Sequence, residues 1–282
     1  MVKNAKTMEV DPYKRILLVG PPGSGKSSQI WTLPGKKFAY IFDANTVPTI
    51  KGCDVDYEMF LPQPGEVDTS LKGFSRGSKS DKPRKRLEPT VYRDWEDDWN
   101  ERDEAKFFAS YDWLIIDSIT SLSHAIMARI LFLNGRYGDL EERSDYMVGG
   151  SKLSDIFTAI SGMPINVFAT GHTRVYEDDK TQKIEAQLNL PGRARQILPM
   201  TFTDTWLTTT RENDEHEVRH FVRTKPENRG FKGIRCTIPN LDIEEDVMIE
   251  DYDKATSYGI GALLNGGDIK ENKDAKNQAR TR

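Results

Sequence analysis

Residues 20 to 27 place glycine, lysine and serine at a spacing that can hold a chain of phosphates. They read Gly-Pro-Pro-Gly-Ser-Gly-Lys-Ser and match the pattern G-x-x-x-x-G-K-[ST]. Glycines let such a loop curl with its amides pointing inward, where they bind phosphate oxygens. Pro21 and Pro22 have no amide hydrogen, so the other residues must form the cradle. The predicted binding residues are Gly20, Gly23, Ser24, Gly25, Lys26, Ser27 and Ser28.

The charged and hydroxyl groups of this loop suit a nucleoside triphosphate. Lys26 can reach the β- and γ-phosphates as a point charge, and the Ser27 hydroxyl can ligate Mg²⁺. An apolar run, Arg15 to Val19, precedes the loop as a buried strand should, and Ser27 to Trp31 can begin a helix. This context argues against a chance match in a glycine-rich turn. We expect ATP and Mg²⁺ as cofactors.

A second chemical group follows an apolar strand further along the chain. Trp113 to Ile116 reads as a strand buried on both faces, and Asp117 follows at its carboxyl end, where doubly wound sheets bind ligands. A carboxylate there can accept a hydrogen bond from a water on Mg²⁺. The alternative is an aspartate that caps the next helix, a role that Ser118 or Thr120 could also fill.

Four segments resemble parts of one known family in the same order. Residues 115–122 (IIDSITSL) resemble the Walker B segment of the RecA/RadA recombinases, and residues 39–45 (AYIFDAN) resemble their second core strand. Residues 165–173 (INVFATGHT) resemble the strand that ends in a γ-phosphate sensor. Residues 190–199 (LPGRARQILP) resemble a segment of compact RecA-like ATPases of bacteriophages, some of which anneal single strands. The resemblance spans about residues 13 to 240.

The resemblance implies both a fold and a function. The fold is an α/β P-loop NTPase with a RecA-like core, in which a mostly parallel sheet is extended by antiparallel strands. The function is ATP hydrolysis, slow or stimulated by DNA, by a protein that binds single-stranded DNA in phage recombination, strand annealing or repair. The expected partners are single-stranded DNA, further copies of the chain in a ring or filament, and a single-stranded DNA-binding protein.

The same resemblance singles out catalytic residues, with one departure. The family places a water-orienting glutamate after the second strand, and this chain has Asn45 there. Asp43 lies two residues earlier and can substitute, although it can also cap a turn. His172 takes the place of the γ-phosphate sensor, but it can equally be a buried, satisfied side chain. A predicted loop, residues 174–190, follows at the position of the second DNA-binding loop, where Arg174 is a candidate contact.

Basic side chains gather in two further segments. Residues 72–86 are rich in lysine, arginine, glycine and serine and can track a phosphate backbone or form a solvated, disordered loop. The cations after the late hairpin can act as arginine fingers toward a neighbouring subunit or protect a strand edge. The candidate DNA contacts are Lys72, Arg76, Lys79, Lys82, Arg84, Lys85, Arg86 and Arg174. The candidate fingers are Arg223, Lys225, Arg229, Lys232 and Arg235.

Composition sets the remaining expectations. The 282 residues are 37% hydrophobic and 30% charged, so polar segments must lie outside a single core. We expect one domain over residues 1–265, with a polar insertion at about 62–106, and a basic disordered tail at 266–282. Two cysteines and no long apolar run predict a cytoplasmic protein without a membrane span, in the host cytoplasm if it is viral.

The apolar patterns predict alternating strands and helices, followed by an antiparallel hairpin. The predicted strands are 15–19, 38–43, 112–116, 165–170, 203–211, 217–224 and 234–238, and the predicted helices are 26–32, 119–134 and 146–161. A rival function remains open, that of a P-loop kinase or nucleotide-switch protein whose basic insertion closes over a phosphorylated small molecule. Assembly with ATP and an oligonucleotide would favour the recombinase-like alternative.

Overall fold

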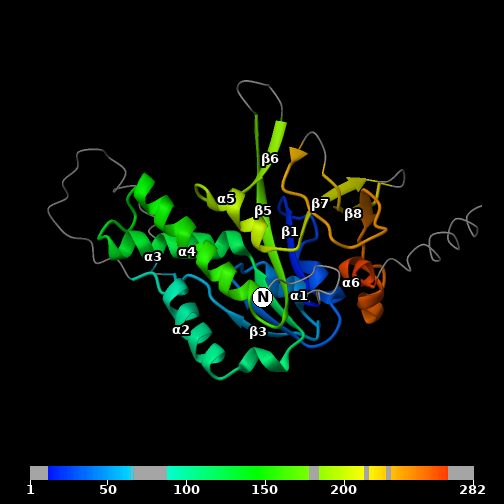
Figure 1. Cartoon of the computed structure of the whole chain (residues 1–282), viewed down its shortest axis with the longest axis horizontal. Coiled ribbons are helices and arrows are strands. Elements are labelled where there is room, and N and C mark those ends of the chain that lie inside the picture. Colours follow the sequence, from blue (N-terminus) through cyan, green and yellow to red (C-terminus); the bar gives the residue numbers. More distant parts are fainter. Residues whose placement is uncertain are drawn as a thin grey trace, which may run out of the picture.

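A mixed sheet with helices on both faces forms the body of the protein (Figure 1). The computed structural model describes residues 12–64, 66, 88–177, 184–212, 216–226 and 230–265. Within them the main path of the sheet has the order β10-β8-β7-β1-β5-β4-β2-β3. The strands are β1 (Arg15–Gly20), β2 (Lys37–Ile41), β3 (Asp56–Met59), β4 (Trp113–Asp117), β5 (Asn166–Glu177), β6 (Ile184–Leu188), β7 (Asp204–Glu212), β8 (Val218–Arg223), β9 (Gly230–Phe231) and β10 (Glu244–Asp246).

The centre of the sheet is parallel, and the strands from β7 through β1, β5, β4 and β2 to β3 all run in one direction. The side chains of β1 and β4 are buried along their whole length, as their unbroken apolar runs predict for strands covered on both faces. β5 lies between β1 and β4, so it separates the P-loop strand from the strand that ends in Asp117. The predicted α/β P-loop NTPase fold is confirmed.

The antiparallel strands extend this core at one side. β8 pairs with β7 and β10 pairs with β8, which confirms the predicted hairpin around residues 213–215. The predicted strand at 234–238 is wrong, because only Arg235 pairs, in an isolated bridge with Thr205. From Leu207 onward that edge of β7 is taken by β8, so it leaves no room for a longer partner.

β5 is longer than the sequence predicts. The predicted strand ended at residue 170, but β5 continues to Glu177. Its first half pairs with β1 and β4, and from Thr173 onward it pairs with β6 instead. The predicted loop over residues 174–190 is therefore largely a β-hairpin, with its tip outside the described residues. Figure 1 shows the two strands extending past the rest of the sheet.

Helices cover both faces of the sheet. The α-helices are α1 (Thr46–Ile50), α2 (Val91–Glu104), α3 (Ile119–Leu133), α4 (Arg143–Ser161), α5 (Ala194–Ile197) and α6 (Gly259–Leu264). The 3₁₀ helices are η2 (Ser27–Thr32), η4 (Phe107–Ser110), η5 (Leu198–Thr201) and η6 (Tyr252–Ser257). The helix predicted after the P-loop is therefore present as the 3₁₀ helix η2, and the helices predicted over 119–134 and 146–161 appear as α3 and α4.

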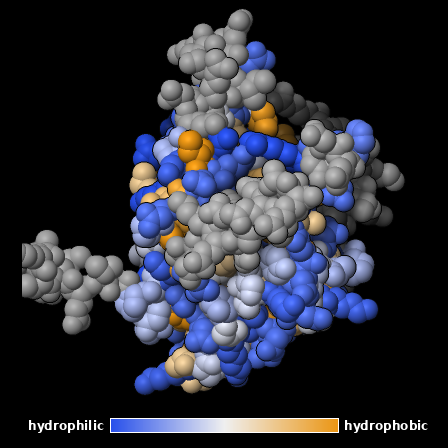
Figure 2. All heavy atoms as spheres, turned by 90° about the vertical axis from the view of Figure 1, so that its right-hand side faces the viewer, coloured by the Kyte–Doolittle hydropathy of each residue, from blue (hydrophilic) through white to orange (hydrophobic). Residues whose placement is uncertain are grey.

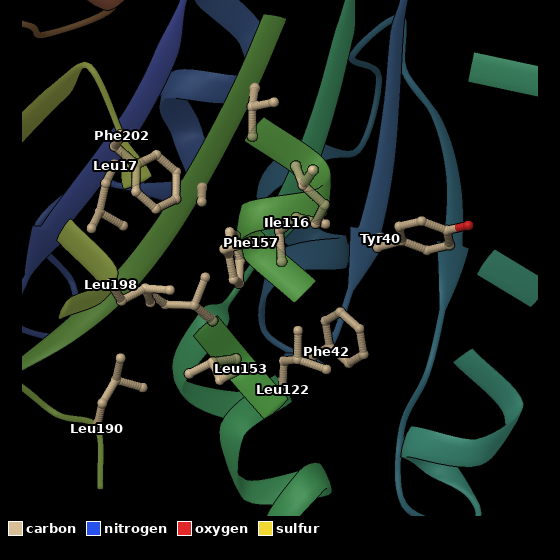
Figure 3. Close-up of a cluster of buried hydrophobic side chains, with 14 of the residues drawn as sticks. Leu17, Tyr40, Phe42, Ile116, Leu122, Leu153, Phe157, Leu190, Leu198 and Phe202 are labelled. Atoms are coloured by element: carbon tan, nitrogen blue, oxygen red, sulfur yellow. The ribbon is translucent and has the colours of Figure 1, made fainter. Parts of the chain in front are cut away.

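One core cluster packs between the sheet and helices α2, α3 and α4 (Figure 3). Leu17 and Ile116 of the sheet, Leu122 of α3, and Leu153 and Phe157 of α4 belong to it, and all five are at most 1% exposed. These side chains recur along the helices at the helical period, which fixes the faces that α3 and α4 turn to the sheet.

Helix α2 changes the interpretation of the predicted polar insertion at 62–106. Trp95 of α2 is fully buried in the cluster, and its ring centroid lies 5.9 Å from that of Trp99, one turn later. The Tyr40 hydroxyl of β2 donates a hydrogen bond of 2.7 Å to Asp98. Residues 91–104 thus form part of the core layer. Residues 72–86 and the predicted tail lie outside the described residues.

The other face of the sheet packs against η2, α1 and α6 in a second cluster that contains Ile16, Leu18, Ile30, Ile260 and Leu263. Figure 2 looks onto the side of the molecule that carries α6, and there the coloured surface is mostly hydrophilic, with small scattered hydrophobic spots. None of the helices in the described ranges combines the length and the hydropathy that a membrane crossing requires.

Candidate functional site

Strand alternation brings the predicted chemical groups to one face of the sheet. Side chains two residues apart on a strand point to the same face. Ile41 belongs to the cluster on the η2 face, so Asp43, two residues later, lies on that face too. Phe168 belongs to the same cluster, which places Thr170 and His172 on the same face. The register pairs Ile41 with Asp117 and Gly20 with His172. The carboxylates and the imidazole therefore meet the P-loop at the carboxyl edge of the parallel strands.

The P-loop has the backbone that its glycines predict. Gly23 and Gly25 have φ of +75° and +82°, in the left-handed region that glycine enters without strain. Gly20 is needed for space, because a Cβ there would lie 1.9 Å from the Thr208 hydroxyl oxygen. That hydroxyl lies 2.6 Å from the Ser24 hydroxyl, which also donates to the Pro21 carbonyl at 2.7 Å. Strand β7 thereby fixes the position of the loop.

Lys26 is held inside its own loop. Its ammonium donates to the carbonyls of Gly20 at 3.1 Å and Pro21 at 2.7 Å, and the residue is 6% exposed. Burial lowers the pKa of Lys26 to about 8, although the charges of Asp117 and Asp43 oppose the shift. A bound polyphosphate would favour the charged form and draw the ammonium away from these carbonyls.

Asp117 is nearly inaccessible, at 2% exposure, and hydroxyl groups orient its carboxylate. The Thr46 hydroxyl donates to Oδ2 at 2.7 Å, and the Thr170 hydroxyl donates to Oδ1. Ser118, rather than Asp117, caps helix α3, since its side chain accepts a hydrogen bond from the Ser121 amide. The carboxylate is therefore not used as a helix cap, and its role toward a metal-bound water stays a prediction.

Asp43 and Asn45, the two candidates for orienting water, contact each other. The backbone amide and the side-chain amide of Asn45 donate to Asp43 Oδ1 at 3.0 and 3.1 Å. Asn45 is exposed and turns its amide toward Asp43. The other carboxylate oxygen, Oδ2, lies 3.8 Å from His172 Nε2. Asp43 thus points toward His172 and the P-loop, with Asn45 as its support.

His172 lies between the carboxylate of Asp43 and the body of the sheet. Its backbone amide donates to the Thr120 hydroxyl at 3.0 Å, which fixes the strand end. Burial and then the charge of Lys26 lower the pKa of His172, while Asp43 and Asp117 raise it. The imidazole is therefore neutral at pH 7. Its Nδ1 is buried and has no hydrogen-bond partner among the described residues. A neutral ring can offer one N–H to a phosphate oxygen.

The predicted finger cations are not gathered at one point. Arg235 donates to the carbonyls of Pro199 and Phe202, and Lys232 pairs with Glu185. Arg223 lies at the end of β8 and Lys225 is exposed just beyond it, whereas Arg229 lies outside the described residues.

The predicted DNA contacts are divided in the same way. Arg174 is exposed on the hairpin of β5 and β6. The remaining candidates, Lys72, Arg76, Lys79, Lys82, Arg84, Lys85 and Arg86, lie outside the described residues.

The donors at this edge fit ATP with Mg²⁺. The left-handed glycines curl the loop so that its amides can face phosphates, and the Ser27 hydroxyl with the Asp117 carboxylate offers the oxygen ligands that Mg²⁺ prefers. Bound Mg²⁺ would neutralise charge on the β- and γ-phosphates. Asp43 and His172 lie on the side of the loop where Asp117 lies, and this is the side on which the sequence predicts the γ-phosphate.

The sequence was compared with protein families and with solved structures, and the family match supports a nucleotide-binding domain. The sequence model of the family described as AAA domain matches residues 13–236, which is more than half of the chain. One solved structure that matches is an ATPase from the type III secretion system of pathogenic bacteria. It has 14% sequence identity and a TM-score of 0.35, and the match covers 70% of this chain and 52% of that one. This chain therefore spans about half the length of that protein.

No curated protein matches the chain. The P-loop, the supported Asp117 carboxylate and the family match agree on a nucleotide-binding ATPase domain. The chain belongs to the family of AAA domains.

Proposed function

We propose that this protein is a DNA-dependent ATPase that binds single-stranded DNA and acts in recombination, strand annealing or repair, of the type that bacteriophages encode. ATP and Mg²⁺ are its cofactors. The observation that carries the proposal is the continuity of β5, which holds His172 at the phosphate end of the site and Arg174 on the projecting hairpin. Only one residue, Thr173, separates the group that would sense the γ-phosphate from the group that would meet DNA.

The groups around the P-loop support slow hydrolysis. Asp43 has one carboxylate oxygen held by Asn45 and the other directed toward His172, so it can orient a water molecule for in-line attack. Lys26 and Mg²⁺ would neutralise the charge that develops on the phosphates. His172 would report the presence of the γ-phosphate to β5, because its backbone is part of that strand.

The hairpin supports contact with a polyanion. Beyond His172, β5 exposes Arg174 and Val175, and among the β6 side chains that the structure describes only Leu188, which pairs with Thr173, is buried. Arg174 and Val175 point to opposite faces of this ribbon, so it offers a cation on one face to a charged DNA backbone and an apolar side chain on the other to bases. Assembly of several copies along DNA, as a ring or filament, would bring Lys225 of one subunit toward the site of the next. A single-stranded DNA-binding protein would supply the substrate.

The test measures ATP turnover with and without single-stranded DNA, together with gel filtration of the same mixtures. We expect DNA to raise turnover, and ATP together with DNA to shift the protein into large assemblies. Lys26→Ala should abolish both effects, and exposed Lys51→Ala should change neither. Turnover and size that do not respond to DNA would contradict the proposal and return attention to the kinase or nucleotide-switch alternative.

A further inference from the structure

The P-loop contacts a histidine that lies outside the groups considered so far. His220 belongs to β8 and pairs with Thr210 of β7. A Cβ placed on Gly25 would lie 3.0 Å from both Cγ and Nδ1 of His220. The imidazole therefore packs directly against Gly25, whose backbone belongs to the phosphate cradle. Glycine at this position provides space for the ring as well as the left-handed backbone.

One ring nitrogen of this imidazole, Nδ1, has no hydrogen-bonding role that the described part of the protein explains. Nδ1 is buried and has no hydrogen-bond partner among the described residues. The backbone carbonyl of His220 is satisfied, since it accepts from the Val247 amide at 2.9 Å. Buried polar atoms in folded proteins are almost always paired, so an unpaired ring nitrogen beside an anion cradle indicates a partner that binds from outside.

The order of the strands indicates which part of a bound nucleotide would lie next to His220. Asp117 and His172 lie on β4 and β5, on one side of β1, whereas His220 lies on β8, two strands away on the other side. Adjacent strands are about 4.8 Å apart, so His220 is roughly 10 Å across the sheet from the P-loop strand. The carboxylates and Mg²⁺ ligands mark the γ-phosphate end, which leaves the end nearest the nucleoside for β8.

We propose that His220 is a nucleotide-binding residue that donates a hydrogen bond from its imidazole to the α-phosphate of bound ATP or ADP. The proposal deepens the nucleotide-binding function and does not depend on DNA. Thr208 and His220 would then act from neighbouring strands, the first by fixing the loop and the second by contacting the ligand. The antiparallel extension of the sheet would thus complete the nucleotide site.

Two substitutions separate hydrogen bonding from packing. His220→Phe keeps an aromatic ring against Gly25 but removes both nitrogens, whereas His220→Gln keeps a donor and loses the ring. We expect His220→Phe to weaken ATP and ADP equally, by about tenfold, as the loss of a hydrogen bond to a charged group implies. His220→Gln should stay within about threefold of wild type. His216→Gln is the matched control, because the His216 side chain is 88% exposed. Calorimetric titration measures all three.

The reverse order, with His220→Phe normal and His220→Gln weak, would overturn the proposal and make His220 a packing residue. A second measurement needs no substitution that could disturb folding. The chain has four histidines, so imidazole nitrogen resonances of the labelled wild-type protein are few. ADP should shift the His220 signals, and a non-hydrolysable ATP analogue should shift both His220 and His172. His220 signals that stay unchanged at ADP saturation would also overturn the proposal.

Discussion

At the scale of single residues, the site places ionisable side chains close together in a buried region, and burial opposes the charged forms of Lys26 and His172. Lys26 lies within the fields of Asp117 and Asp43, yet burial still lowers its pKa to about 8. His172 is kept neutral by the same burial and by Lys26. Before the nucleotide binds, the region thus holds an ammonium group with a lowered pKa and a neutral imidazole. A polyphosphate stabilises the charged form of both, so binding and protonation are coupled.

The first prediction uses this coupling at Lys26. Near pH 8 the free protein holds Lys26 partly deprotonated, and bound phosphates raise its pKa, so ATP binding should take up protons. The part of this uptake that comes from Lys26 should decline toward pH 7, where Lys26 is already charged, and His172→Ala removes the part that comes from His172. Calorimetry in buffers of different ionisation enthalpy measures it. Lys26→Met, which has similar length and no charge, should bind ATP about 100-fold more weakly. Proton release at pH 8, or an unaffected Lys26→Met, would contradict this account.

The second prediction concerns the water-orienting group. Asp43→Asn should lower kcat for ATP about 100-fold and leave KM nearly unchanged, because orienting water matters in the transition state. Asn45→Ala removes the side-chain hydrogen bond to Asp43 but keeps the carboxylate, so it should lower kcat only a few fold. Single-turnover hydrolysis distinguishes the two variants. A larger loss in Asn45→Ala than in Asp43→Asn would assign the role to the amide.

The sequence predicts the residues whose role depends on local pattern. Lys26 and Asp117 are fixed by their place in a loop and at a strand end, and both predictions of position hold. Thr46 and Thr170 were missed, because their contact with Asp117 spans 71 and 53 residues of chain. The one sequence signal for Thr170 is that it lies two residues before His172 in the same strand-like segment, so both side chains point to the same face. Such partners follow from strand order, which a single sequence does not specify.

At the scale of elements, the neighbours of a strand decide what its pattern becomes. Residues 234–238 have the pattern of a strand, but β8 already occupies the edge of β7 that they would need. Residues 91–104 look polar, yet one face of α2 carries Trp95 into the core. Which strand takes an edge of β7, and which face of α2 is buried, both depend on tertiary contacts. Local composition alone therefore gives the wrong interpretation for residues 234–238 and 91–104.

The third prediction tests how β7 holds the P-loop. Gly20→Ala should reduce the free energy of unfolding by about 1–3 kcal/mol, since its Cβ would meet the Thr208 hydroxyl. Thr208→Ala should cost less, and the double variant should recover part of the loss. Recovery stays incomplete because the added Cβ also lies 3.0 Å from the Thr208 carbonyl. Denaturant unfolding measures this cycle. Additive effects of the two substitutions would show that they do not interact.

At the scale of the whole molecule, the net charge of the chain differs from the local charges on the hairpin of β5 and β6. The chain carries a net charge of −4, so the proposed binding of DNA would have to rely on local cations rather than on the overall field. Arg174, exposed on the hairpin, is the candidate for this role. Glu177 and Glu185 stand on the same two strands, and Glu185 is engaged by Lys232 and Tyr176. Pairing of this acid lowers the repulsion that a phosphate backbone would meet there.

The fourth prediction follows from counterion release. Arg174→Gln should reduce the slope of log K against log salt for single-stranded DNA by about 0.7, the contribution of one phosphate contact. Arg211→Gln is the matched control, because this exposed arginine of β7 already pairs with Glu244. Fluorescence anisotropy between about 50 and 200 mM salt measures both. Equal slopes for wild type and Arg174→Gln would remove Arg174 from the contact.

The last prediction joins the two ends of β5. If His172 senses the γ-phosphate and the same strand presents Arg174, ATP should tighten DNA binding, and DNA should tighten ATP binding by the same factor. A coupling of this kind is typically about 5- to 150-fold. His172→Ala should bring both factors close to 1, since the strand loses its contact with the phosphate. Arg174→Gln should weaken DNA binding with and without nucleotide and leave the factor intact. Measuring the DNA and ATP dissociation constants, each with and without the other ligand, completes the cycle. Full coupling in His172→Ala would show that the nucleotide state reaches DNA by a route other than β5.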